Sequence, residues 1–203
     1  MFVVLLRIRG DKVNVYDFDN TIYRGESTLD YYFFCVKHHP KLIRFVFIIL
    51  FELVKYKLCL VSEEELMSLC EKYVMAFLKD CPDSEELAEK FWQRNFKKIK
   101  GFYGELHKED DVIISASFGF MLRPVMKRLG VHELVCSEVN LETGEIERLC
   151  FRRNKKTLYD ELYGKEIDNF YTDSLNDMPL IEAAKCAFIV KGERIVRWSG
   201  KNA

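Results

Sequence analysis

The sequence has no C-x-x-C pair, no excess of either charge and no apolar run long enough to cross a bilayer. Its seven cysteines stand at irregular spacings, which favours reduced thiols in a cytoplasmic protein over a disulfide framework. The formal net charge of −1 argues against a nucleic-acid partner. Residues 1–10 are apolar, but two arginines interrupt them and no small-residue cleavage site follows, so we expect no signal peptide.

The order of apolar and polar residues predicts an α/β fold. At 203 residues and 49% hydrophobic content, the chain suits one domain, or one domain that carries an insertion. Strands are expected at residues 13–18, 111–115, 134–136, 169–172 and 187–190, the last of which closes the pattern. Helices are expected at residues 119–129, 155–163 and 176–184. This alternation implies a Rossmann-like three-layer core, with a mostly parallel sheet between helices.

Residues 27–100 show no comparable strand pattern and predict helices alone. The expected helices are residues 28–37, 41–57, 62–79 and 84–98. A helical block inserted after the first core strand is best interpreted as a cap over the active site. We therefore expect a core of residues 1–26 and 101–203, with a helical cap of residues 27–100.

The segment from Leu42 to Val54 is apolar nearly all round, and only Arg44 and Glu52 interrupt it. Thirteen residues are too few to span a bilayer, so burial in a core or at a partner interface is the favoured interpretation. Contact with a membrane surface is the less favoured alternative.

Three polar residues stand where predicted strands end. Asp17, Ser115 and Asp173 lie at such carboxyl ends, where ligands of parallel sheets bind. Asp19 follows Asp17 by one residue, and the bend after the strand allows both carboxylates to serve one small site. Asp177 comes four positions after Asp173. Taken alone, Asp17 and Asp19 fit an acidic turn as well as a catalytic pair.

These residue types suit metal-assisted cleavage of a phosphate monoester. One carboxylate can attack phosphorus, and a second can protonate the leaving oxygen. Mg²⁺ takes oxygen ligands and keeps several waters, so one or two carboxylates and a phosphate oxygen suffice to hold it. A hydroxyl group and a lysine complete the neutralisation of the phosphate charge. Lys155 and Lys156, at the start of a predicted helix, are the candidate lysines.

Four motifs in this order resemble those of the haloacid dehalogenase-like superfamily of hydrolases. They are Asp17-Phe-Asp19-Asn-Thr21, Ser115 at the end of Val112-Ile-Ile-Ser, Lys155 or Lys156, and Thr172-Asp173-Ser-Leu-Asn-Asp177. The resemblance covers about residues 13–190. A single D-x-D motif would be weak evidence, but the four motifs together are highly specific.

The resemblance implies a role for each residue. Asp17 would be the nucleophile and Asp19 the general acid and base. Mg²⁺ would be held by the Asp17 carboxylate, the Asp19 backbone carbonyl and Asp173, while Asp177 would act through water or by orienting its neighbours. Ser115 and the lysine would bind phosphate oxygens.

The long helical insert is similar to class IB of the superfamily, which includes phosphoserine phosphatase and carries a helical C1 cap. Glu26 stands nine residues after Asp17, as a glutamate does in that enzyme, and is our candidate for substrate contact from the cap. The run Cys150-Phe-Arg-Arg-Asn-Lys155 resembles the family's Cys-x-Gly-x-x-Lys spacing and favours Lys155 over Lys156. Thr172 stands where the family usually has a glycine before the aspartate of the fourth motif. Ser115-Ala-Ser-Phe118 stands where phosphoserine phosphatases have Ser-Gly-Gly-Phe. These departures leave the substrate open.

The leading hypothesis is a Mg²⁺-dependent phosphomonoesterase that hydrolyses a small or amphiphilic phosphorylated metabolite through an aspartyl-phosphate. The alternatives are a phosphotransferase with the same intermediate, and a non-catalytic interaction module that docks through Leu42–Val54. A hydrolytic dehalogenase needs no magnesium site, which leaves Asp19 and Asp173 without a purpose. The sequence pattern favours neither a monomer nor an oligomer.

Overall fold

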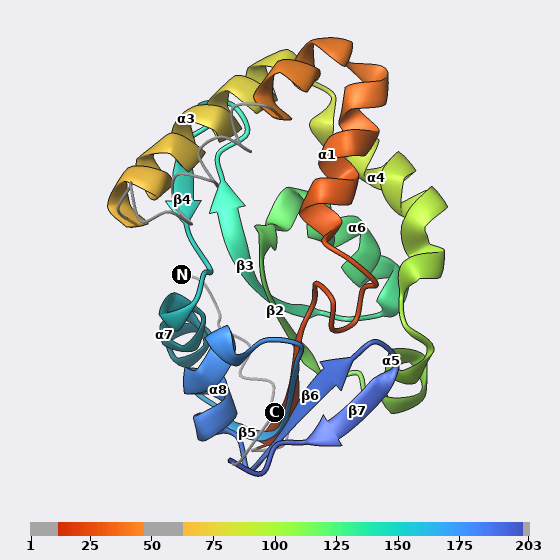
Figure 1. The fold of residues 1–203 in the computed structure, drawn as a ribbon, viewed down its shortest axis with the longest axis vertical. Coiled ribbons are helices and arrows are strands. Elements are labelled where there is room, and N and C mark those ends of the chain that lie inside the picture. Colours follow the sequence, from red (N-terminus) through yellow and green to blue (C-terminus); the bar gives the residue numbers. More distant parts are fainter. Residues whose placement is uncertain (1–11, 47–62, 201–203) are drawn as a thin grey trace, which may run out of the picture.

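A seven-stranded sheet forms the centre of the molecule (Figure 1). The structure is a computed structural model, and it describes residues 12–46 and 63–200. The strands lie in the order β4-β3-β2-β1-β5-β6-β7, and β4 and β7 pair antiparallel at the two edges of an otherwise parallel sheet. Their bounds are β1 Lys12–Asp17, β2 Val112–Phe118, β3 Glu133–Val139, β4 Ile146–Arg148, β5 Glu166–Thr172, β6 Cys186–Lys191 and β7 Arg194–Arg197.

Both faces of the sheet are covered, which explains the continuous apolar runs in its inner strands. Successive side chains of a strand point to opposite faces. Val15 and Ile114 therefore belong to one apolar cluster, while Tyr16 and Ile113 belong to the other. The strands thus form the middle of three layers, as the sequence pattern predicts.

Helices fill the outer layers and one end of the molecule. The helices that flank the sheet are α5 Gly101–Leu106, α6 Gly119–Leu129, α7 Arg153–Leu162 and α8 Met178–Ala183, and the short turn η3 Leu175–Asp177 precedes α8. Helices α1 Ser27–His38, α3 Glu63–Asp80 and α4 Ser84–Asn95 gather at one end (Figure 1), with the turns η1 Pro40–Leu42 and η2 Phe96–Lys98. These last helices come from the segment in which the sequence predicts helices alone.

The α/β fold class is confirmed, and the errors concern short or exposed elements. The sequence pattern misses α5, β4 and β7, so the expectation that a strand at residues 187–190 closes the fold is wrong. β7 is missed because its side chains are mostly exposed. Of the apolar segment Leu42–Val54, residues 43–46 are helical, and residues 47–54 lie outside the described residues. Residues 1–10 lie outside them as well. Within residues 12–46 and 63–200, no helix combines the length and apolar character needed to cross a membrane.

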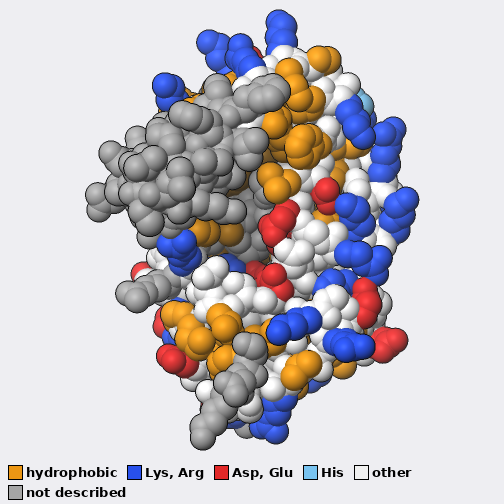
Figure 2. Space-filling model, viewed as in Figure 1, with side chains coloured by type: hydrophobic (Ala, Val, Ile, Leu, Met, Phe, Trp, Pro, Cys, Tyr) orange, Lys and Arg blue, Asp and Glu red, His pale blue; other side chains and the backbone are white. Residues whose placement is uncertain are grey.

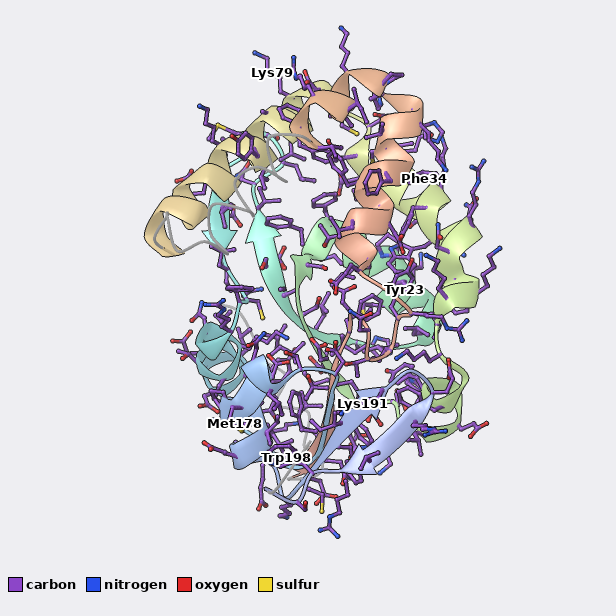
Figure 3. All side chains as sticks on the ribbon, viewed as in Figure 1. Tyr23, Phe34, Lys79, Met178, Lys191 and Trp198 are labelled. Atoms are coloured by element: carbon purple, nitrogen blue, oxygen red, sulfur yellow. The ribbon has the colours of Figure 1, made fainter. Side chains whose placement is uncertain are left out.

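Aromatic side chains join the helical end to the core. Trp92 of α4 is fully buried, and its Nε1 donates a hydrogen bond of 2.7 Å to the carbonyl oxygen of Met121 in α6. Tyr23, which Figure 3 shows at the base of α1, donates through its hydroxyl to Asp30 at 2.7 Å. Lys98, on the segment that returns to the core, also donates to Asp30 at 2.7 Å. The two chain segments that connect the helical end to the core, one after β1 and one after α4, therefore both bond to Asp30 of α1.

Candidate active site

A sharp turn after β1 brings two carboxylates to the carboxyl edge of the sheet. Asp17 is the last residue of β1, and the backbone N–H groups of Ile22 and Tyr23 both donate to the Phe18 carbonyl at 2.9 Å. Asn20 takes a φ of +56°, a left-handed conformation that asparagine tolerates better than most residues. Thr21 lies inside this turn, and its hydroxyl donates to Asp17 Oδ2 at 3.2 Å.

Lys155 lies between two carboxylates from different parts of the chain. Its Nζ is 2.7 Å from Asp17 Oδ1 and 3.1 Å from the carboxylate of Asp177. All three side chains are buried. Burial alone would lower the pKa of Lys155, but Asp17 and Asp177 outweigh it and raise that pKa. Lys155 is therefore a permanent cation in the site.

The backbone before α7 has the shape that a glycine would ordinarily supply. Arg152 stands at the glycine position of the Cys-x-Gly-x-x-Lys spacing and takes a φ of +48°, which is uncommon for a residue with a side chain. The chain then enters α7, and Lys155 lies in its first turn. Arg152 therefore adopts the positive φ that glycine adopts more readily.

Asp19 is held by the start of α1 and the end of β2. The backbone N–H of Ser27 donates to Asp19 Oδ1 at 2.6 Å, and the Ser117 hydroxyl donates to Asp19 Oδ2 at 2.9 Å. The Thr28 and Ser117 hydroxyl oxygens are 2.7 Å apart. Burial raises the pKa of Asp19, while the bonds from Ser27 and Ser117 oppose that rise.

Asp17 and Asp173 also bind protons more tightly than ordinary aspartates. Burial raises the pKa of Asp17 to about 6; Lys155 opposes this rise, and Asp177 and Asp19 add to it. Burial also raises the pKa of Asp173 to about 6, and the charge of Asp17 adds to that rise. Carboxylates that raise one another's pKa form a region of negative charge which favours a cation.

The donor set fits a hard divalent cation. The charges of Asp177 and Asp19 act on Asp17, and the charge of Asp17 acts on Asp173. These carboxylates therefore lie near one another at the edge of the sheet and supply oxygen ligands. Mg²⁺ is bound in proteins by one or two carboxylates together with water and phosphate oxygens. The residues present therefore fit the ion that the sequence motifs imply.

Ser115 lies on the strand next to Asp17. Asp17 pairs with Ile114 in the β1–β2 register, so Ser115 is one residue further towards the carboxyl edge. It is buried, and its Oγ accepts a bond of 3.1 Å from the backbone N–H of Ser117. This places the hydroxyl at the same edge as the acidic cluster.

Two candidate residues bond to partners outside the cluster, although the charge of Glu26 also raises the pKa of Asp19. Lys156 is half-buried on α7 and pairs with Asp160 one helical turn later, which leaves Lys155 as the lysine of the site. Glu26 is exposed, and it accepts a hydrogen bond from the Asn20 side chain. It lies directly before α1 and joins the turn after β1 to the helical end.

Two hydroxyl groups of the site were missed as contributors by the sequence reasoning. Ser117 binds Asp19, and Thr172 donates from its Oγ1 to Asp177 Oδ2 at 2.9 Å. Both stand where the sequence departs from the family's glycines. The replacement of glycine by serine or threonine at these positions could have indicated the contacts, because each residue adds a hydroxyl group next to a carboxylate.

The sequence matches the family model described as haloacid dehalogenase-like hydrolase over residues 15–182. The chain therefore belongs to this hydrolase family, and the family resemblance of its motifs is confirmed. No curated protein matches the sequence.

Solved structures share the fold at low sequence identity. A Bordetella pertussis Tohama I protein of unknown function has a TM-score of 0.67 and 19% identity, over 87% of this chain and 88% of that one. A phosphoserine phosphohydrolase-like protein from Francisella tularensis has a TM-score of 0.54 and 16% identity, over 87% and 85% of the two chains. A probable phosphoserine phosphatase from Vibrio cholerae has a TM-score of 0.57 and 13% identity, over 87% of this chain and 55% of that one.

Proposed function

We propose that this chain is a Mg²⁺-dependent phosphomonoesterase that works through an aspartyl-phosphate on Asp17. The observation that carries the proposal is the buried contact of 2.7 Å between Lys155 Nζ and Asp17 Oδ1. A lysine held against a carboxylate at the edge of a parallel sheet neutralises an anion that approaches that carboxylate. The family of hydrolases to which the chain belongs supports the same conclusion.

The proposed reaction has two steps on the same two aspartates. Asp17 attacks phosphorus and forms an Oδ–P bond as the P–O bond to the leaving group breaks, and Asp19 gives its proton to that leaving oxygen. A water molecule then attacks phosphorus and gives a proton to Asp19. The Oδ–P bond breaks and inorganic phosphate leaves. Burial raises the pKa of Asp19, and a raised pKa is the direction that suits a carboxyl group acting as a general acid.

The other residues bind and orient. Ser115 and Lys155 would bind phosphate oxygens. The ion would be held by the Asp17 carboxylate, the Asp19 backbone carbonyl and Asp173, and it would supply positive charge to the phosphoryl oxygens. Asp177 would orient its neighbours, since it contacts both Lys155 and Thr172.

We also propose that residues 27–100 form a cap and that residues 1–26 and 101–203 form the core. Helices α1, α3 and α4 lie together at one end of the molecule (Figure 1). Ser27 and Thr28, the first residues of α1, contact Asp19 and Ser117 at the sheet edge. A helix that begins against the catalytic carboxylates is well placed to select the substrate.

Hydrolysis of para-nitrophenyl phosphate, with and without Mg²⁺, tests the proposal. Asp17→Asn should lower kcat by at least about 10³-fold, because the nucleophile is lost. Asp160→Asn, at an exposed position on α7, is the matched control and should keep full activity. Removal of the metal with EDTA should abolish turnover, and added Mg²⁺ should restore it. Full activity in Asp17→Asn would overturn the mechanism.

A further inference from the structure

An apolar cavity of about 150 Å³ lies between α1, α3 and the start of α6. Aromatic rings dominate its lining, with Tyr31 and Tyr32 from α1, Phe77 from α3, and Phe118 and Phe120 from the β2–α6 junction. On the face seen in Figure 2, hydrophobic side chains gather over the cap and border a group of acidic side chains below them. The cavity is distinct from the carboxylate cluster in its chemistry.

Tyr31 and Tyr32 contribute their rings to the cavity, while their hydroxyl groups bind backbone carbonyls. Tyr31 donates its O–H to the backbone carbonyl of Ser84 at 2.6 Å, and Tyr32 donates to the carbonyl of Leu42. Among the described residues that line the cavity, none carries a formal charge. A ligand group with an ammonium and a carboxylate would therefore lose its hydration there without gaining a partner.

The cavity lies next to the proposed catalytic residue Asp19, and Thr28 and Ser117 connect the two. Thr28 lines the cavity, and its hydroxyl lies 2.7 Å from that of Ser117. Ser117 donates to Asp19, and the next residue, Phe118, lines the cavity again. A phosphate monoester whose leaving oxygen meets Asp19 would thus have its organic group directed towards Thr28 and Phe118.

We propose that this cavity binds the apolar group of the substrate, so that the substrate class is phosphate monoesters of hydrophobic alcohols. The proposal rests on the proposed phosphomonoesterase function and adds the substrate class to it. A cavity of ~150 Å³ lined by apolar side chains holds a benzene-sized group in another protein. The cavity therefore suits about six carbon atoms next to the phosphate.

A series of n-alkyl phosphates from ethyl to decyl tests this inference by the release of inorganic phosphate. Each methylene that enters the cavity should raise kcat/KM by up to about fourfold, and the rise should level off near six carbons. O-phosphoserine should be a poorer substrate than hexyl phosphate. A kcat/KM that is flat along the series, with measurable turnover, would overturn the inference and leave the hydrolase function intact.

Variants that change the volume of the cavity sharpen the test. Val74→Trp fills the cavity from α3 and should lower the ratio of kcat/KM for hexyl over ethyl phosphate by about tenfold or more. Phe77→Ala opens it and should move the plateau to longer chains, so the inference stays testable if Val74→Trp fails to fold. Lys79→Trp is the matched control, because Lys79 is exposed at the outer end of the same helix (Figure 3) and outside this cavity. It should keep the parent ratio.

Binding of alkyl phosphonates separates the inference from the reaction. These compounds resist hydrolysis, and isothermal titration calorimetry in Mg²⁺ measures their affinity directly. Affinity should rise from ethyl- to hexylphosphonate in the parent protein and in Asp17→Asn. A rise in affinity without turnover of any ester would support the cavity and overturn the phosphomonoesterase proposal. Equal affinities along the series would overturn the cavity.

Discussion

The carboxylate cluster and the apolar cavity are adjacent, and their buried groups differ in polarity. In the cluster, Lys155 and the hydroxyl of Thr172 bind buried carboxylates, because a buried charge without a partner is costly. In the cavity, the hydroxyls of Tyr31 and Tyr32 bind backbone carbonyls, so these side chains present apolar ring faces. The two regions meet at Thr28 and Ser117, whose hydroxyls face each other.

Under the proposed function, this difference assigns the reaction and the choice of substrate to different elements. In the cluster, Asp17 ends β1 and Asp173 follows β5, so the sheet fixes their positions. Ser115 lies within β2, which continues to Phe118 and so does not end at residue 115 as the sequence pattern predicts. Lys155 and Asp177 come from α7 and η3. The cavity is built mainly from α1 and α3, which lie outside the sheet. Changes in the helices should therefore alter which ester is used, while changes at the strand ends should alter how fast any ester is cleaved.

Removal of the lysine from the cluster should have the largest effect. Lys155→Met should lower kcat/KM for every ester by about 10²- to 10³-fold, because the phosphate charge loses its partner. It should also lower the free energy of unfolding by about 3 kcal/mol, since Asp17 and Asp177 are left buried without a cation. Steady-state kinetics and urea unfolding measure these losses.

Lys156→Met is the matched control for that variant. Lys156 pairs with Asp160 on the helix surface, so its loss should change both quantities little. Equal losses in the two variants would contradict the placement of Lys155 in the site.

Ser117→Ala acts where the two regions meet and should have an intermediate effect. The bond from Ser117 lowers the pKa of Asp19, so its removal should raise that pKa further. The proposed first step needs protonated Asp19, and kcat/KM should therefore begin to fall at a higher pH than in the parent protein. At neutral pH the activity should drop about tenfold, because Asp19 loses a hydrogen bond that orients it. A pH profile of kcat/KM measures both changes.

Ser137→Ala is the control that distinguishes the pH shift expected for Ser117→Ala from a mere loss of stability. Ser137 is a buried serine on β3 that bonds to the backbone at Ala116 and Cys150. Its removal should reduce stability without moving the pH profile. An unmoved profile in Ser117→Ala would contradict the contact with Asp19 as a working part of the site.

Thr28→Val should have the smallest effect and should act on selection. The substitution keeps the shape of the side chain and makes the mouth of the cavity apolar. The ratio of kcat/KM for hexyl over ethyl phosphate should rise about two- to threefold. Thr157→Val, at an exposed position on α7, should leave the ratio unchanged. A lower ratio in Thr28→Val would contradict the position of Thr28 at the mouth.

The long elements of the fold were predictable because their patterns are strong. The strand at residues 13–18 and the helix at residues 119–129 correspond closely to β1 and α6, since a buried strand and an amphipathic helix leave clear apolar periods. β4 has only three residues and β7 is mostly exposed, so neither leaves such a period. Pairing with a neighbouring strand, which the local sequence does not encode, decides these edges.

By itself, the sequence determined the family and the position of each polar residue along the strands. Parallel strands bring their carboxyl ends to one edge, so Asp17, Ser115 and Asp173 were predictable neighbours. The spacing after Cys150 favoured Lys155 over Lys156, and the tertiary structure places Lys155 against Asp17. The tertiary structure alone decided that Ser117 meets Asp19. It also decided that rings from α1, α3 and the β2–α6 junction enclose a cavity beside them. These contacts join segments far apart in the chain, and only their packing determines which side chains meet.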